Sequence, residues 1–145
     1  MTIRSHQSED FILDCSITMA WCFEDEVTDY SENVFISLDK SKAFVPTIWS
    51  LEIANVILFA ERKRRINRAK ATAFIESIRS LPIFHDDNSQ IAMSTTLEIA
   101  RETHLTIYDA NYLELALRLR LPLATLDKDL RKAAQKNDVK LYLLN

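Results

Sequence analysis

The sequence predicts a three-layer α/β/α sandwich built on a mainly parallel sheet of about five strands. Short apolar runs without alternating polar residues recur along the chain, as in strands that are covered on both faces. Longer segments with apolar residues at helical spacing separate these runs. Because strands that alternate with helices form parallel sheets with helices on both faces, this pattern indicates an α/β fold.

Each expected element follows from its residues. The expected strands are the apolar runs at 11–13, 43–45, 82–84, 123–126 and 140–144. Amphipathic helices are expected at about 16–24, 28–38, 67–81, 90–103 and 128–136. Two further helices begin near Trp49, with Thr47 as the expected cap, and at Asp109, with Pro122 as the stop. On the helix at 90–103, the expected inward residues are Ile91, Met93, Leu97 and Ala100.

The composition is that of one domain. A chain of 145 residues, 48% hydrophobic and 27% charged, predicts a single domain over residues 10–145 after a flexible leader over residues 1–9. No apolar run approaches the ~20 residues that cross a bilayer, and the start MTIRSHQSED lacks the apolar segment of a secretory signal. We therefore expect a cytoplasmic protein in which Cys15 and Cys22 are reduced and buried.

Composition also excludes several kinds of site. Glycine is absent, which excludes phosphate-binding loops of the Walker or dinucleotide type. Turns that need a positive φ are therefore expected at Asn or Asp residues, for example Asn67, Asn88 and Asn137. The three histidines show no zinc-ligand spacing, and the net charge of −3 argues against a general nucleic-acid coat.

Acidic residues recur where the predicted strands and helices meet. Asp14 follows the first strand, Asp127 follows the strand at 123–126, and Asp109 lies above an apolar helix face. Ligands of open α/β sheets bind beyond the carboxyl ends of the strands. We therefore expect these three side chains to lie close together.

Other polar residues accompany these acids. Glu52 lies on an apolar helix, and Asn55, one turn away, shares its face. Ser16 and Thr125 each lie two residues from an acid and are candidates to hold water or phosphate, and Asp129 is a fifth acid nearby. Glu52 is the hardest of these to explain structurally, because Glu is rarely buried unless it is paired.

Carboxylates that converge without His or Cys suit a hard divalent cation, Mg²⁺ or Mn²⁺. Such a cation supports hydrolysis of a phosphate ester by polarising the phosphoryl oxygen and activating water. Taken singly, these acids also have structural explanations. Asp109 and Asp127 stand where helix N-caps are common, and Asp14 stands where turns form.

Two basic groups flank the acidic positions. The run from Arg62 to Arg65 is typical of the solvated end of a helix, with RNA phosphates or an acidic partner as alternatives. A second group beside Asp127 is better placed to bring a polyanion to the acids. It comprises Lys128, Arg131, Lys132 and Lys136. Tyr108 and Tyr112 are candidates to stack on bases, although aromatic residues at helix starts are more often core.

Four segments carry the acids in a characteristic order. They are Phe-Ile-Leu-Asp14-Cys-Ser16, Pro46-Thr-Ile-Trp-Ser-Leu-Glu52-Ile-Ala-Asn55, Tyr108-Asp109-Ala-Asn-Tyr-Leu-Glu-Leu-Ala and Leu-Ala-Thr125-Leu-Asp127-Lys-Asp129-Leu. In this order and at these separations they resemble the motifs of the PIN-domain ribonucleases, most closely the VapC-type toxins of bacterial toxin–antitoxin pairs. The resemblance covers about residues 11–144.

The resemblance implies a PIN-like fold and a Mg²⁺- or Mn²⁺-dependent endoribonuclease. It also implies a homodimer that a cognate antitoxin protein inhibits by placing its tail in the acidic groove. The implied metal-binding acids are Asp14, Glu52, Asp109 and Asp127, supported by Ser16, Asn55, Thr125 and Asp129. The sequence departs from relatives at His104 and Arg65, where glycine is common, but no acid is lost.

Two other metal-binding classes fit less well. A receiver-like module needs adjacent acids after the first strand and a lysine after the last, whereas Asp14 stands alone and Lys140 precedes its strand. A haloacid-dehalogenase-type phosphatase needs a second Asp where Ser16 stands. The remaining alternative is a protein of the same fold that acts mainly through complex formation.

Overall fold

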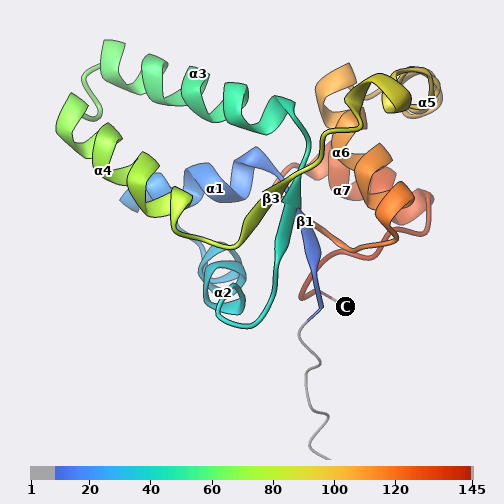
Figure 1. Cartoon of the computed structure of the whole chain (residues 1–145), viewed down its shortest axis with the longest axis horizontal. Helices are drawn as coiled ribbons and strands as arrows, with labels where there is room; N and C mark the ends of the chain where they lie inside the picture. Colours follow the sequence, from blue (N-terminus) through green and yellow to red (C-terminus); the bar gives the residue numbers. More distant parts are fainter. Residues whose placement is uncertain (1–8, 145) are drawn as a thin grey trace, which may run out of the picture.

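The computed structural model, which describes residues 9–144, has a parallel sheet with helices on both sides (Figure 1). The strands lie in the order β3 (Ile83–His85), β2 (Ala43–Val45), β1 (Phe11–Leu13) and β4 (Leu123–Ala124). Each pair of neighbours is parallel. The predicted α/β class and its parallel sheet are therefore confirmed.

The helices form the two outer layers. Figure 1 shows α1 (Cys15–Cys22), α3 (Ile48–Arg62) and α4 (Arg68–Arg79) on one side of the sheet. It shows α5 (Ser89–Thr103), α6 (Ile107–Leu119) and α7 (Lys128–Lys136) on the other. A short 3₁₀ turn at Glu24–Glu26 follows α1, and α2 (Asp29–Ser37) packs against α1.

Strand β1 is the centre of the core. All three of its residues are 0% exposed, as their uninterrupted apolar character predicts. The ring of Tyr142 stacks on Phe11 with centroids 4.0 Å apart, which covers the start of the strand. From β1 the chain adds β2 and β3 on one side and later β4 on the other, so the strand order reverses at β1.

The sheet has one strand fewer than expected, because the segment at 140–144 makes only an isolated bridge between Leu141 and Leu123. Asp138 and Leu143 have φ values of 59° and 58°, which interrupt the extended conformation on both sides of this bridge. β4 is also shorter than expected and ends at Ala124.

Two helix starts differ from the prediction. Thr106, not Asp109, caps α6, and its hydroxyl accepts the backbone N–H of Asp109 at 3.1 Å. Thr47 does not cap α3, because its own backbone is helical and its hydroxyl donates to the carbonyl of Asp86 at 3.0 Å. Asp109 is therefore a first-turn residue of α6, and a cap role does not explain it.

The expectation of positive φ at Asn or Asp residues holds at Asp138 but is wrong at the three positions given as examples. Asn67, Asn88 and Asn137 all have negative φ, and Asn67 caps α4 by accepting the N–H of Lys70 at 2.8 Å. Within residues 9–144 the positive values belong to Arg64, His104, Arg120, Asp138 and Leu143. His104 and Arg120 end α5 and α6, where the chain reverses in the left-handed conformation without a glycine.

The inward face of α5 also differs from the prediction. Ile91, Met93 and Leu97 are 78%, 69% and 41% exposed, whereas the buried positions are Ala92, Thr96 and Ile99. These buried residues are smaller on average and recur at spacings of four and three, which suits close packing of α5 on α6. An apolar face of α5 is left uncovered.

Three further expectations concern the chain as a whole. Apart from Glu9, the leader over residues 1–9 lies outside the described residues. None of the helices within residues 9–144 combines the length and the apolar character needed to cross a membrane. Cys15 and Cys22 are buried and free, as expected.

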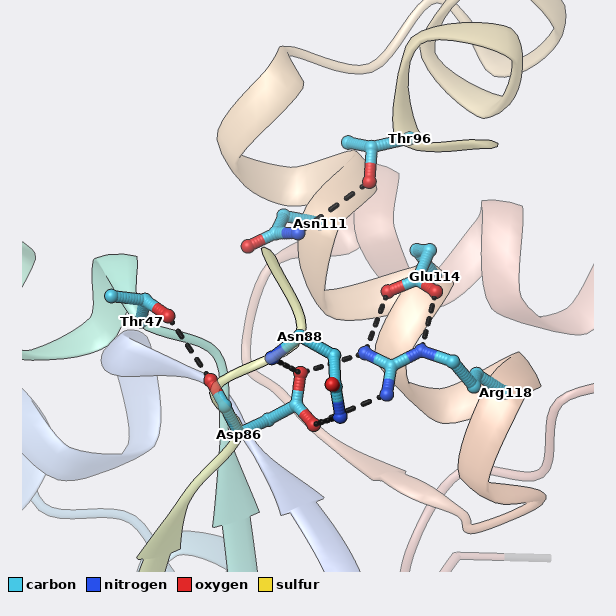
Figure 2. A network of polar contacts seen from close by, with 7 residues as sticks. All are labelled: Thr47, Asp86, Asn88, Thr96, Asn111, Glu114 and Arg118. Atoms are coloured by element: carbon cyan, nitrogen blue, oxygen red, sulfur yellow. Dashed lines mark hydrogen bonds and ion pairs between the residues drawn. The ribbon is translucent and has the colours of Figure 1, made fainter. Parts of the chain in front are cut away.

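An ion network joins α6 to the end of β3. Figure 2 shows the Arg118 guanidinium between Asp86, which follows β3, and Glu114, one turn earlier on α6. Arg118 donates to both oxygens of Asp86 at 3.1 and 2.7 Å and to both oxygens of Glu114 at 2.8 and 3.2 Å. The Arg118 side chain holds the pKa of Asp86 below its usual range. Glu114 is 3% exposed, so this arginine compensates a buried charge.

We expect Arg118→Ala to lower the free energy of unfolding by about 3 kcal/mol, because it leaves Glu114 buried without a cation. Urea unfolding at neutral pH measures the loss. The matched control is Arg101→Ala, which removes an ion pair with Glu98 whose side chains are more than 60% exposed. That control should cost less than ~1 kcal/mol, and equal losses in the two variants would contradict the assigned role.

Candidate active site

The site lies where the carboxyl ends of β1 and β4 meet, at the reversal of strand order. Asp14 directly follows β1, and its backbone N–H donates to the carbonyl of Ala124 in β4 at 3.0 Å. Its side chain is nearly buried, with 5% of the residue exposed. Asp14 therefore lies at the buried, inner end of the site, where the ends of β1 and β4 meet.

Two hydroxyls hold the Asp14 carboxylate. Ser16 and Thr125 donate to its Oδ2 at 2.6 and 2.7 Å. The same hydroxyls accept backbone N–H groups beyond β4, from Leu126 to Ser16 at 3.0 Å and from Asp127 to Thr125 at 3.0 Å. They tie the chain after β4 to the chain after β1, so both are occupied in shaping the site rather than free to bind a ligand.

Asp127 is half-buried at the start of α7. Its Oδ1 accepts the N–H of Leu130 at 2.8 Å, so the helix-cap explanation holds for this oxygen. The described residues supply Oδ2 with no hydrogen bond. The cap fixes the side chain and leaves one oxygen available for a ligand.

Glu52 reaches the site from α3 and is half-buried. Tyr112, which is 0% exposed on α6, donates its hydroxyl to Oε1 of Glu52 at 2.6 Å. Burial and the nearby carboxylates of Asp14 and Glu52 raise the pKa of Tyr112, so its hydroxyl remains a donor at neutral pH. Asn55 is exposed, and the structure shows no hydrogen bond between it and Glu52.

Asp109 completes the set from the first turn of α6. Burial raises its pKa to about 6, and the charges of Asp14, Asp127 and Asp129 add to the effect. The hydrogen bond to Thr106 opposes this rise. The fold therefore brings Asp14, Asp127 and Asp129 close enough to Asp109 for their charges to act on it.

Burial and neighbouring charges also act on Asp14 and Glu52. Burial raises the pKa of Asp14 against the hydroxyls of Ser16 and Thr125, and the charge of Asp127 raises it further. Burial raises the pKa of Glu52 against the hydroxyl of Tyr112, with Asp14 and Asp109 adding to it. Mutual repulsion of this kind disfavours the fully ionised cluster and favours a bound cation.

The donor set fits a hard divalent cation in its chemistry, since it offers several carboxylates and no sulfur or imidazole. Within residues 9–144, no three His, Cys, Asp or Glu side chains are grouped tightly enough to hold an ion as they stand. Ion binding therefore requires side-chain adjustments among these acids.

A cleft of about 650 Å³ lies between the end of α5 and α7, and of the four candidate metal-binding acids Asp109 lines it. Asp109 and Asp129 form one part of its lining, and His104, Lys132 and Lys136 form another. Among the basic residues expected beside Asp127, Lys128 and Lys132 are exposed.

Arg131 and Arg65, one from each of the two basic groups, make contacts within the fold. Arg131, which belongs to the group beside Asp127, donates to the carbonyl of Thr125 at 2.7 Å and lies over the ring of Tyr30, so its guanidinium supports the segment that carries Thr125. From the basic run at 62–65, Arg65 pairs with Asp25 at 3.1 Å and lies over Phe23.

Sequence reasoning missed two features. The sequence offers Tyr112 as a base-stacking or core residue and gives no sign of its bond to Glu52. The ion network of Glu114 and Arg118 was also missed, although their spacing of four is a signal for it. Lys136, by contrast, belongs to the basic group expected beside Asp127, and it lines the cleft together with Lys132.

We expect Asp109→Asn to stabilise the chelator-treated protein at pH 8 by about 1–2 kcal/mol. A carboxyl pKa near 6 instead of near 4 corresponds to ~3 kcal/mol, which solvent screening reduces. Because the raised pKa favours the protonated folded state, wild-type stability rises relative to the variant as pH falls through 6. The advantage of the variant should vanish near pH 4.

Urea unfolding between pH 4 and pH 8 tests this expectation. Asp39→Asn, at an exposed position after α2, serves as the control and should leave the pH profile unchanged. A constant offset between Asp109→Asn and wild type over this range would contradict the mutual repulsion.

Comparisons with known proteins agree with this geometry. The family model described as "PIN domain" matches residues 11–136, and PIN domains are generally metal-dependent nucleases. A comparison with curated proteins returns no match. Among solved structures, the crystal structure of PAE2754 from Pyrobaculum aerophilum is similar, with a TM-score of 0.65 and 20% identity. The similarity covers 90% of this chain and 83% of that one, and at this identity it shows the fold alone. From the match to the family model over most of its length, the chain belongs to the PIN-domain family.

Proposed function

We propose that this chain is a Mg²⁺- or Mn²⁺-dependent endoribonuclease that hydrolyses RNA phosphodiester bonds in the cytoplasm. The observation that carries the proposal is a group of half-buried to buried carboxylates from four elements, in which burial, with neighbouring charges adding to it, raises the pKa values of Asp14, Glu52 and Asp109. Such a group is electrostatically unfavourable without a cation and suits one well. Family membership supports nuclease chemistry at this position.

In this proposal Asp14, Glu52, Asp109 and Asp127 hold the cation. Ser16 and Thr125 keep Asp14 in place, and Asp129 adds negative charge beside the cleft. When bound, the cation offsets the carboxylates, polarises the phosphoryl oxygen and promotes ionisation of the attacking water. Burial of Asp14 excludes bulk solvent from the inner end of the site, which strengthens electrostatic interactions there.

The cleft beside the acids is the proposed path of the RNA backbone. Lys132 and Lys136 line it within the same space as Asp109 and Asp129. The lysines attract the phosphates, while a cation bound by the acids would neutralise the repulsion that the carboxylates exert.

We further propose that the protein is the toxin of a type II toxin–antitoxin pair, a homodimer whose cognate antitoxin blocks the acidic site. The order and spacing of the four acidic motifs support the toxin assignment. The uncovered apolar face of α5 supports the dimer, because exposed Ile91, Met93 and Leu97 are suited to burial against a second copy.

Wild type is expected to cut total bacterial RNA into discrete fragments with Mn²⁺ or Mg²⁺, and chelation should abolish cutting. Asp109→Asn should reduce the rate by about 100-fold or more, as does removal of a preorganised charge in other active sites. Gel electrophoresis and mapping of fragment ends measure both effects.

Loss of folding would not explain this result, because Asp109→Asn is expected to be the more stable protein near pH 8. Fragments that persist at the wild-type rate in the variant would contradict the assigned role. A folded wild type that binds Mn²⁺ but cuts no RNA would instead favour the alternative, in which the protein acts mainly through complex formation.

We expect Lys132→Ala, in the Asp109→Asn background, to weaken RNA binding similarly across different RNA sequences. Loss of one phosphate contact should reduce the slope of log affinity against log salt by about 1. Fluorescence anisotropy with labelled RNA at several salt concentrations measures this slope. The control is Lys40→Ala, which changes an exposed lysine that precedes β2, at the amino ends of the strands and away from the site. An equal change of the slope in both variants would exclude the cleft as the path of the RNA.

A further inference from the structure

Tyr112 uses an acid of the candidate site as the hydrogen-bond partner that its buried hydroxyl requires. Its ring is 0% exposed, yet its hydroxyl lies 2.6 Å from Oε1 of Glu52, which is half-buried. The two residues come from α6 and α3 and are 60 positions apart in the chain. Tyr112 also follows Asp109 by three residues, so one stretch of α6 carries both an acid and a donor toward a second acid.

Glu52 needs such a donor for a physical reason. Its side chain has three rotatable bonds, and the neighbouring charges of Asp14 and Asp109 repel it. Without a fixed partner, the carboxylate gains by rotating away toward solvent. A buried tyrosine has only two side-chain torsions, and packing fixes both, so its hydroxyl is a rigid anchor.

The hydrogen bond also divides the work of the two oxygens. Oε1 is occupied by Tyr112, and the described residues supply Oε2 with no hydrogen bond. We propose that Tyr112 is a positioning residue that holds Glu52 through Oε1 and leaves Oε2 to bind the divalent cation. This inference rests on the proposed function, since it takes Glu52 as a metal ligand.

Mn²⁺ affinity, measured by EPR of the free ion, tests the inference without relying on cleavage. Tyr112→Phe keeps the buried ring and removes only the hydroxyl, and we expect it to weaken Mn²⁺ binding about 10-fold or more. The matched control is Tyr142→Phe. This hydroxyl is also buried, but it contacts Ser41 at 3.3 Å at the opposite edge of the sheet, so its loss should leave Mn²⁺ affinity unchanged.

A double-mutant cycle separates positioning from general damage to the fold. If Tyr112 acts through Glu52, Tyr112→Phe should produce no further loss of Mn²⁺ affinity in a Glu52→Ala background. If the hydroxyl only supports the fold, the loss should appear in both backgrounds, which would overturn the inference. Circular dichroism and melting temperature verify that all four proteins are folded at the temperature of measurement.

Cleavage provides a second readout. At saturating Mn²⁺ the Tyr112→Phe variant should recover its rate with an unchanged KM for RNA, and a loss that persists there would overturn the positioning role. Wild-type affinity in Tyr112→Phe would overturn this inference alone. A folded wild type that binds no Mn²⁺ would overturn the proposed metal site and, with it, the role of Tyr112.

Discussion

The pairing of β1 with β4 determines where the candidate active site of this protein lies. β1 has β2 on its other side, so the strand order reverses at β1, and ligands of open α/β sheets bind beyond the strand ends at such a reversal. The N–H of Asp14 donates to Ala124, which places the first acid against the segment that carries Thr125 and Asp127. Glu52 and Asp109 come from helices on the two sides of the sheet, and the charge of Asp109 acts on Glu52.

Hydroxyl groups make this concentration of negative charge tolerable. Burial disfavours the ionised form of each acid, whereas a short hydrogen bond from a hydroxyl favours it. Ser16 and Thr125 supply two such bonds to Asp14, and Tyr112 supplies one to Glu52. No arginine or lysine within residues 9–144 forms an ion pair with these acids, so their charge remains available to a cation. Arg118, by contrast, forms ion pairs with both Asp86 and Glu114, as expected of acids with a structural role.

The sequence indicated which residues are buried and where the acids lie, because both depend on local pattern. The runs at 11–13 and 43–45 form strands as expected, and the helices lie within a few residues of their predicted ranges. The turns were not predictable from residue preference, since α5 and α6 end in the left-handed conformation at His104 and Arg120. The face of α5 was misjudged because close packing of helices favours small residues such as Ala92 over the larger apolar ones.

The bonds within the site lay beyond the sequence for a different reason. The bonds from Thr125 to Asp14 and from Tyr112 to Glu52 join residues far apart in the chain, so local spacing contains no signal for them. The positions of the acids at strand ends and the order of the four acidic motifs pointed to the convergence of the acids, but not to the hydrogen bonds that hold them.

Helix α6 couples the stability of the fold to the geometry of the site. Asp109 and Tyr112 lie near its start and face the other acids, while Glu114 and Arg118 lie further along and fix the helix to the end of β3 (Figure 2). A helix is stiff over this length, so a shift at Arg118 moves Asp109 and the Tyr112 hydroxyl together. Hydrogen-bond lengths near 2.6 Å tolerate little displacement. The ion network lies outside the group of acids at the candidate site. It nevertheless contributes to the positions of two side chains there, those of Asp109 and Tyr112.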